Sequence, residues 1–479
     1  MSIRKSLAYS YLDRYASLML SIVSSMVIAR LLTPQDIGIY SVTMVMLTFL
    51  ATVRDMGAGG YLVQEKELTK ERVRAVWAVQ LGLGWFLAIV VLLGSVPAAH
   101  FYNEPRMKSI MFVLAANYAV NPFGSLTYAW QIREMRFDAL ALVRFSSTLV
   151  GALVSIYLAW IGMGPISLAI GSFGSTLVNA LMAIYFRPKW FPWLPGTKEI
   201  KRVLSFGSKS TGASIFQTIG GSAAELLLGK LQSMTATGLF SRAGGFVSMF
   251  DRLVMSAISS VAISWFAKQS REEGNITLPF LKATSYVTAV GWSFSLGTIF
   301  LAYPAIRIMY GDQWDGAVDL TRLLAAALAC GMPAAMCMSA LMAVGAVNSV
   351  LRVTAVTTVI AVILTAIGAS IGLLALGVCV TVASIVRSIF WLNATQKEAQ
   401  FSYSAMFVTL RSSAVVSLAA GVAPALVFAF YGATPSNVWS PLLLGVAGSV
   451  IGFFAMIKWI AHPLLEELDP IVNRLLARN

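Results

Sequence analysis

The sequence predicts an all-α, polytopic membrane protein with about 14 transmembrane helices, arranged as two like-oriented six-helix lobes and two C-terminal helices. Three observations predict this fold class. Apolar residues make up 58% of the chain and charged residues 12%, and the mean hydropathy is +0.76, values beyond those of soluble domains. Apolar stretches of roughly 20 residues, the length that crosses a bilayer, recur along the 479 residues. A weak internal repeat relates the first half of the chain to the second.

The predicted crossings follow one another through short connections, which leave no room for a soluble domain. The first crossing contains serines and lacks a small-residue cleavage signature, so we expect it to be retained rather than removed as a signal peptide. Three cysteines fall in apolar segments and predict neither a disulfide framework nor a metal site. The predicted crossings are 8–29, 37–60, 75–99, 108–130, 139–161, 166–186, 205–229, 237–262, 278–302, 317–343, 353–373, 374–394, 412–431 and 440–460.

The orientation follows from the lysine and arginine residues of the connections. One set of connections carries 21 of them and the other set carries 5. Because cytoplasmic loops are enriched in these residues, both termini are predicted to be cytoplasmic. The same asymmetry accounts for most of the net charge of +14, so no nucleic-acid partner is needed to explain it.

Charged residues also lie inside the predicted crossings, where cations outnumber acids. An ionised side chain at bilayer depth is costly and normally faces a bundle interior or a water-filled cavity. Small and hydroxylated residues follow the charged helices at helical spacing. Close helix packing produces such stripes too, but together with the charges they favour a hydrated, net cationic cavity. The embedded cations are Arg14, Arg54, Arg144, Lys209, Arg242, Arg252, Lys282, Arg322 and Arg387, and the embedded acids are Asp13, Asp55, Glu225, Asp251 and Asp319.

The embedded acids have two readings, because each has a cation nearby. They form static ion pairs, or they couple transport to H+ or Na+. The dyads Asp13-Arg14 and Arg54-Asp55 both lie toward the cytoplasmic ends of their helices, so we predict that they pair across helices and close an inward gate. The remaining candidates for gating or coupling are Glu225, Asp251, Asp319 and Arg322.

The repeat places residues 29–41 over 229–241 at a constant offset of 200, matching a basic residue, a leucine, a glycine, an aromatic residue and a serine. An even number of crossings in each half predicts halves related by an axis along the membrane normal, which can rock about a central site. The predicted domains are an N-terminal lobe (1–186), a cytoplasmic connector (187–204), a C-terminal lobe (205–394), and two further crossings with a cytoplasmic tail (395–479).

Several runs resemble a known family. Residues 29–40 and 54–64 resemble the opening repeat of bacterial polysaccharide-biosynthesis membrane proteins, and residues 228–230, 238–243 and 310–318 resemble corresponding runs in the second half. These proteins are the Wzx-type lipid-linked oligosaccharide flippases of the multidrug/oligosaccharidyl-lipid/polysaccharide (MOP) exporter superfamily. The resemblance covers nearly the whole chain. One departure is Glu225, where relatives often carry an aspartate; a carboxylate is kept.

The resemblance implies two six-helix lobes around a cationic cavity and a multi-pass transporter of the bacterial inner membrane. It implies alternating access that moves an undecaprenyl-diphosphate-linked oligosaccharide from the cytoplasmic to the periplasmic leaflet, for exopolysaccharide, capsule or O-antigen. The last two crossings correspond to a lipid-tail groove or to plain structural helices. We expect a monomer that contacts membrane lipid and other polysaccharide-assembly proteins, with no cofactor and with coupling to H+, Na+ or the membrane potential. The cavity cations that the resemblance implies are Arg14, Arg54, Lys209, Arg242 and Arg252.

Three rival functions remain open. A multidrug exporter shares the repeat, but an organic-cation cargo fits a net negative cavity better. A flippase for the peptidoglycan precursor shares both the cavity charge and the lipid carrier. A membrane enzyme of polysaccharide polymerisation would need a sizeable catalytic loop, and the sequence shows no Ser/His/Asp set, metal spacing or glycine-rich phosphate loop. We therefore predict a transporter and not an enzyme.

Overall fold

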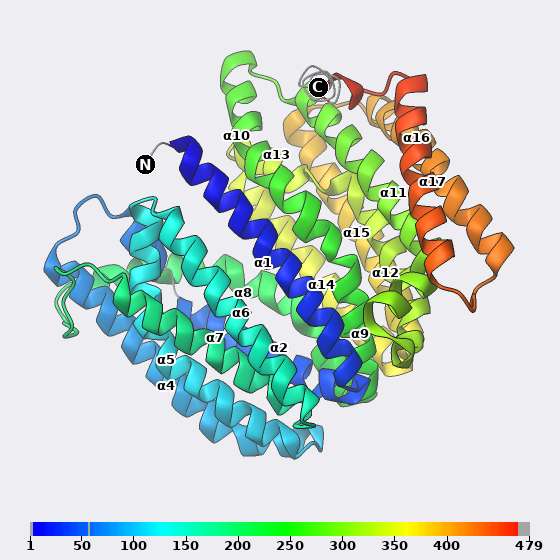
Figure 1. Cartoon of the computed structure of the whole chain (residues 1–479). Coiled ribbons are helices and arrows are strands. Elements are labelled where there is room, and N and C mark those ends of the chain that lie inside the picture. The colour runs from blue at the N-terminus through cyan, green and yellow to red at the C-terminus, as the bar shows by residue number, and fades with distance from the viewer. Residues whose placement is uncertain (1–2, 56–57, 468–479) are drawn as a thin grey trace. The chain divides into compact units, whose positions relative to one another are not determined.

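A computed structural model describes residues 3–55 and 58–467, with side chains described except at 3–14, 53, 55, 58, 206–217, 219, 260 and 273. All regular elements in these ranges are helices (Figure 1). Twelve described stretches are long and apolar enough to cross a membrane, and Tyr15–Leu31 is a shorter apolar helix. The predicted all-α, polytopic membrane fold is confirmed.

The chain packs as two units, residues 1–238 (unit 1) and 239–479 (unit 2). Within unit 1, α4 packs against α5, α5 and α6 pack against α7, and α1 packs against α6 (Figure 1). A second contact joins α2 to α8, where the hydroxyls of Thr52 and Thr218 lie 3.1 Å apart. The elements of unit 1 are α1 (Ile3–Leu31), α2 (Pro34–Asp55), α3 (Ala58–Gln64), α4 (Lys70–Tyr102), α5 (Arg106–Arg133), α6 (Phe137–Trp160), α7 (Ile166–Tyr185), α8 (Ile200–Leu231) and the first turn of α9 (Met234–Val247).

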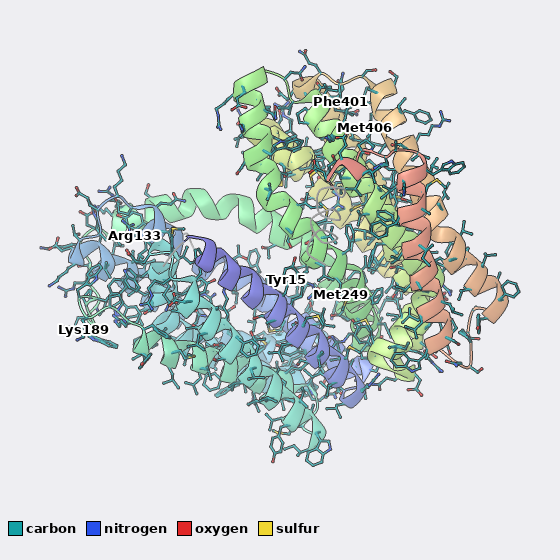
Figure 2. The ribbon with its side chains drawn as sticks, turned by 45° about the horizontal axis from the view of Figure 1, so that its top comes forward. Tyr15, Arg133, Lys189, Met249, Phe401 and Met406 are labelled. Carbon is teal, nitrogen blue, oxygen red and sulfur yellow. The ribbon has the colours of Figure 1, made fainter. Side chains whose placement is uncertain are left out.

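Unit 2 is built around α11, which packs against α12, α16 and α17. Its largest core cluster includes Phe280, Phe401 and Met406, and the last two are labelled near one end of the unit in Figure 2. The elements of unit 2 are the rest of α9, a π-helix (Asp251–Met255), α10 (Ser256–Glu273), α11 (Thr277–Tyr310), a 3₁₀ turn (Asp312–Ala317), α12 (Val318–Gly331), a second 3₁₀ turn (Met332–Ala334), α13 (Cys337–Ala343), α14 (Val347–Ile371), α15 (Leu373–Ala399), α16 (Tyr403–Tyr431) and α17 (Trp439–Trp459).

The predicted crossing 317–343 is interrupted, because α12 ends at Gly331 and α13 begins at Cys337. At this break the Met332 N–H donates to the carbonyls of Leu328 and Ala329. Three side chains from neighbouring helices add further donors: Trp292 Nε1 donates to the Ala329 carbonyl at 2.8 Å, and the hydroxyls of Ser384 and Ser388 donate to the carbonyls of Ala327 and Cys330, each at 2.7 Å. Backbone breaks at membrane depth are tolerated where neighbouring protein groups satisfy them in this way.

The segment predicted as a connector lies against the start of α4. The Gly196 N–H donates to the Arg74 carbonyl at 3.1 Å, and Trp77 Nε1 donates to the Trp193 carbonyl at the same distance. The Arg187 guanidinium lies 4.1 Å from the centre of the Trp193 ring. The proline- and tryptophan-rich segment is therefore a packed part of unit 1.

The internal repeat has a structural counterpart in unit 1, at the first turns of α2 and α9. An added Cβ at Gly38 would lie 1.7 Å from the Met234 carbonyl oxygen, and one at Gly238 would lie 1.9 Å from the Pro34 carbonyl oxygen. Both pairs of positions are related by the offset of 200. The two helix starts therefore touch backbone to backbone, at a distance that only glycine permits.

Hydroxyl caps begin both helices at that crossing. Thr33 Oγ1 accepts the Asp36 N–H at 3.2 Å, and Ser233 Oγ accepts the Ala236 N–H at 3.1 Å. A cap of this kind typically contributes about 1 kcal/mol. The caps and the glycines together fix where the two repeat-related helices start and how closely they approach.

Candidate functional site

The candidate site is a cavity of about 630 Å³ inside unit 1. It lies among α2, α3, α4, α5 and α7, and its lining combines apolar groups with one cation and several amides and hydroxyls. Its volume is in the range of sites that enclose a small-molecule ligand. The lining residues are Arg54, Gly59, Gly60, Val63, Gln64, Gln80, Asn121, Pro122, Ser125, Tyr128, Ala129, Ile132, Ser175, Thr176 and Asn179.

Arg54 is the predicted cavity cation that lines this space. It is half-buried near the end of α2, and its guanidinium carbon lies 5.4 Å from the centre of the Tyr118 ring. The Tyr118 hydroxyl in turn donates to the Leu47 carbonyl, which fixes the ring against α2. The aromatic face attracts the cation and holds its planar guanidinium, a group whose geometry matches phosphate oxygens, at the edge of the cavity.

The amides of the cavity come from three different helices. Gln80 of α4 is 8% exposed, and its Oε1 has no hydrogen-bond partner among the described residues. Asn121 of α5 and Asn179 of α7 also line the cavity. Asn179 Oδ1 would lie 2.3 Å from an added Cβ at Gly124, so a glycine makes room for this amide.

The hydroxyls of the cavity are oriented by their own helices. Ser125 Oγ donates to the Pro122 carbonyl and Thr176 Oγ1 donates to the Ser172 carbonyl, each at 3.1 Å. The oxygens of both side chains are therefore left to accept hydrogen bonds from a bound molecule. The Tyr128 hydroxyl accepts from Arg144, which lies 5.3 Å from the centre of the same ring.

The charges beside the cavity are ordered. Arg133 Nη1 donates to the Leu62 carbonyl at 2.9 Å, which ties the end of α5 to α3, and Figure 2 shows Arg133 and Lys189 at the same end of unit 1. Glu65 follows directly after α3. A hydrogen bond from Tyr61 and the positive charges of Arg202 and Arg72 hold the pKa of Glu65 below its ordinary value. This carboxylate is thus kept ionised within a cationic rim.

Two predicted cavity cations, Arg242 and Arg252, lie in unit 2 and have partners there. The Arg242 guanidinium lies 5.6 Å from the centres of both the Tyr310 and the Trp314 rings. Arg252 is the second residue of the π-helix, and its guanidinium donates to the Gly245 carbonyl at 2.9 Å and to Ser248 Oγ at 3.2 Å. π-helical turns are frequent at functional sites.

The described candidates for gating or coupling are Arg322, Asp319 and Asp251 in unit 2 and Glu225 in unit 1. Arg322 Nη1 donates to Asp319 Oδ1 at 2.7 Å and its Nε donates to the Ile299 carbonyl at 3.2 Å, which is the static arrangement. Asp251 is exposed at the start of the π-helix, and Glu225 is half-buried on α8. The side chains of Asp13, Arg14, Asp55 and Lys209 lie outside the described residues.

Unit 2 contains an apolar cavity of about 360 Å³. One face of α11 and one face of α17 line it, with Phe246 of α9 at its edge. Phe294, Leu301 and Phe453 are among the lining residues, and Ser293, Thr298 and Ser449 are the polar ones. Such a surface suits a hydrocarbon chain rather than a headgroup.

The sequence analysis missed the amides of the unit 1 cavity, because it rested on charged residues and on stripes of small and hydroxylated residues. A usable signal was present: Gln80, Asn121 and Asn179 are amides inside otherwise apolar helices. Amides in membrane spans are costly unless they find a polar partner, so they mark packing contacts or wet cavities.

Comparison with known proteins places the chain among membrane proteins of polysaccharide assembly. A family model described as "Polysaccharide biosynthesis protein" matches residues 27–319. The chain is 24% identical over 327 residues to the succinoglycan biosynthesis transport protein ExoT of Rhizobium meliloti (strain 1021), covering 68% of this chain and 66% of that protein. It is 21% identical over 309 residues to the lipopolysaccharide biosynthesis protein WzxC of Escherichia coli (strain K12), covering 64% and 62%. These matches span about two thirds of the relatives' lengths.

Solved structures share the fold. The lipid II flippase MurJ in an inward closed conformation superimposes with a TM-score of 0.79 at 13% identity, covering 97% of this chain and 100% of that one. An inward-facing multidrug resistance MATE family transporter of the MOP superfamily gives a TM-score of 0.65 at 14% identity, covering 82% and 96%. The predicted MOP-type fold is thereby confirmed.

Proposed function

Since this chain belongs to the polysaccharide biosynthesis protein family, we propose that it is a flippase for surface polysaccharide assembly. It moves an undecaprenyl-diphosphate-linked oligosaccharide from the cytoplasmic to the periplasmic leaflet by alternating access. The observation that carries the proposal is Arg54, a cation in a polar cavity inside a many-helix membrane protein. A diphosphate that leaves water needs fixed cations, and arginine offers a planar fork of donors that matches phosphate oxygens.

The lipid carrier needs a second, apolar surface. We propose the cavity between α11 and α17 for part of the polyprenyl chain, because its lining is almost wholly apolar. Headgroup and tail would then be held by different surfaces of the protein, one cationic and polar and one apolar. The protein is proposed to act as a monomer in the inner membrane, with both termini cytoplasmic as the loop charges predict.

Deletion of the gene tests the function. A flippase deletion should accumulate the lipid-linked oligosaccharide on the cytoplasmic side and lose the surface polysaccharide, and the wild-type gene should restore both. Accumulation of the peptidoglycan precursor instead would assign the rival flippase function. Unimpaired surface polysaccharide would refute the proposal.

Complementation with point variants tests the role of Arg54. Arg54→Gln should fail to restore export, whereas Arg54→Lys should restore part of it, because the charge remains and the bidentate geometry is lost. Lys198→Gln is the matched control, because Lys198 is a cation of unit 1 that pairs with Glu71 in solvent. Equal export by Arg54→Gln and Lys198→Gln would remove Arg54 from the site.

A further inference from the structure

We infer that the unit 1 cavity recognises sugar hydroxyl groups, with Gln80, Asn121 and Asn179 as the specificity-determining residues. The inference rests on the proposed function and adds a role to it: Arg54 meets the phosphate, and the amides meet the sugar linked to it. All of these side chains line one cavity of about 630 Å³.

The lining chemistry favours a hydroxylated ligand over a purely ionic one. Each amide offers both donors and acceptors, which is what a sugar hydroxyl needs on its neighbours, since a hydroxyl both donates and accepts. Among the described residues that line the cavity, Arg54 carries a charge and none is a carboxylate. A metal or proton site would need acidic or imidazole groups there.

Gln80 presents an acceptor to the cavity. The residue is 8% exposed, and its Oε1 accepts no hydrogen bond from the described residues. A buried amide oxygen left unsatisfied costs about 1–3 kcal/mol. A donor in the cavity, such as a sugar hydroxyl, removes that cost, and an aromatic ring at Tyr128 offers an apolar face for a sugar ring.

The position of the cavity suits capture from one leaflet. Gln80 lies ten residues from the start of α4, Tyr128 lies five from the end of α5 and Asn179 lies six from the end of α7. At about 1.5 Å per residue, these side chains are about 8–15 Å from helix ends that adjoin the lysine- and arginine-rich connections. In the predicted orientation, that is the cytoplasmic half of the membrane, where the sugar is attached to its carrier.

Binding by the purified full-length protein in lipid nanodiscs tests the inference. The probes are undecaprenyl diphosphate and its glucose-linked and galactose-linked forms. The wild-type protein should bind at least one sugar-linked form more tightly than undecaprenyl diphosphate. Gln80→Met, Asn121→Leu and Asn179→Leu should each lower the affinity for that form about tenfold and leave undecaprenyl diphosphate unchanged. Arg54→Gln should weaken all three probes.

Gln131→Met is the matched control. Gln131 is an amide of α5 that is 1% exposed and lies outside the cavity lining, so its loss should leave the ratio of affinities as in the wild type. Unchanged affinity for undecaprenyl diphosphate shows that each variant is folded.

Three results overturn the inference. The first is that the wild type binds undecaprenyl diphosphate and its sugar-linked forms equally. The second is that the amide variants bind all probes like the wild type, as expected if the cavity holds water only. The third is that these variants lose affinity for all probes to the same extent. With any of these results, accumulation of the lipid-linked oligosaccharide in the deletion strain would continue to support the flippase function. Failure of the function is seen separately, as export that does not need this protein.

Discussion

Replacing Gly38 by alanine tests whether the backbone crossing of α2 and α9 is as close as the structure indicates. The new Cβ would lie 1.7 Å from the Met234 carbonyl oxygen, whereas carbon–oxygen contacts between helices are about 3.3–3.6 Å. The two helix starts must therefore separate by about 1.6–1.9 Å, because the Met234 carbonyl and Gly238 are backbone groups, not side chains that can turn aside. Overpacking typically costs about 1–3 kcal/mol, and we expect the upper end here.

The assay is the apparent melting temperature of the purified protein in detergent. A loss of about 3 kcal/mol corresponds to a decrease on the order of 3–6 °C for a chain of this length. Gly82→Ala is the control, because an added Cβ at Gly82 meets nothing within 4 Å and alanine favours the helix by about 0.5–1 kcal/mol. A melting temperature of Gly38→Ala equal to that of the control would refute the crossing.

A double variant sharpens the test. The Cβ added by Gly238→Ala would lie 1.9 Å from the Pro34 carbonyl oxygen. Either substitution alone therefore forces the same two helix starts apart. Once one methyl group has pushed the helices apart, the second should cost little. The loss in Gly38→Ala/Gly238→Ala should thus be well below the combined losses of the single variants, and additive losses would show that the two contacts are independent.

Three further outcomes are expected. His462 is 1% exposed, its Nδ1 accepts the Leu464 N–H at 3.2 Å, and burial lowers its pKa below the ordinary 6.5. The neutral ring therefore stabilises the fold above about pH 6.5, and this contribution is lost as the pH falls below that value. The melting temperatures of the wild type and of His462→Gln should accordingly converge or cross between pH 7.5 and 5.5. Parallel curves would contradict a neutral, buried His462. Arg322→Gln should lower the free energy of unfolding by about 1.5–3 kcal/mol, because its hydrogen bonds to Asp319 and to the Ile299 carbonyl are lost. If the pair is a static one, Asp319→Asn should leave any ion dependence of transport intact. Loss of that ion dependence would instead assign coupling to Asp319. Outward movement of two negative charges is favoured by about 4.6 kcal/mol per 100 mV of inside-negative potential, so transport in proteoliposomes should slow when the potential is collapsed, and an unchanged rate excludes this drive.

The fold was largely predictable because hydropathy and helix length dominate in a membrane. Some predicted crossings agree with observed helices to within three residues, as for 440–460 and α17, whereas others are shorter than their helices, as for 412–431 and α16. The breaks were not predictable in the same way. Residues 317–343 are apolar throughout, and the interruption after Gly331 depends on Trp292, Ser384 and Ser388, which come from other helices and are distant in the sequence.

The site was less predictable, since charge alone was a coarse guide. It led to Arg54, which lines the unit 1 cavity, and equally to Arg322, which pairs with Asp319 and donates to the Ile299 carbonyl. Only three-dimensional packing distinguishes these two arginines. The amides Gln80 and Asn179 carry no charge and became candidates only when helices from different parts of the chain brought them to one cavity.

The internal repeat therefore accounts for where helices start, whereas it does not account for the charged candidate residues. At the offset of 200, the glycines and the hydroxyl caps of α2 and α9 have equivalents, and both serve to start and appose helices. The charged candidates have none: Arg54 corresponds to Val254, Arg242 to Val42 and Arg252 to Thr52. Duplication accounts for the scaffold, whereas each half has its own polar chemistry. The residues that bind substrate must accordingly be sought separately in each unit, because none of Arg54, Arg242 and Arg252 has a basic counterpart at this offset.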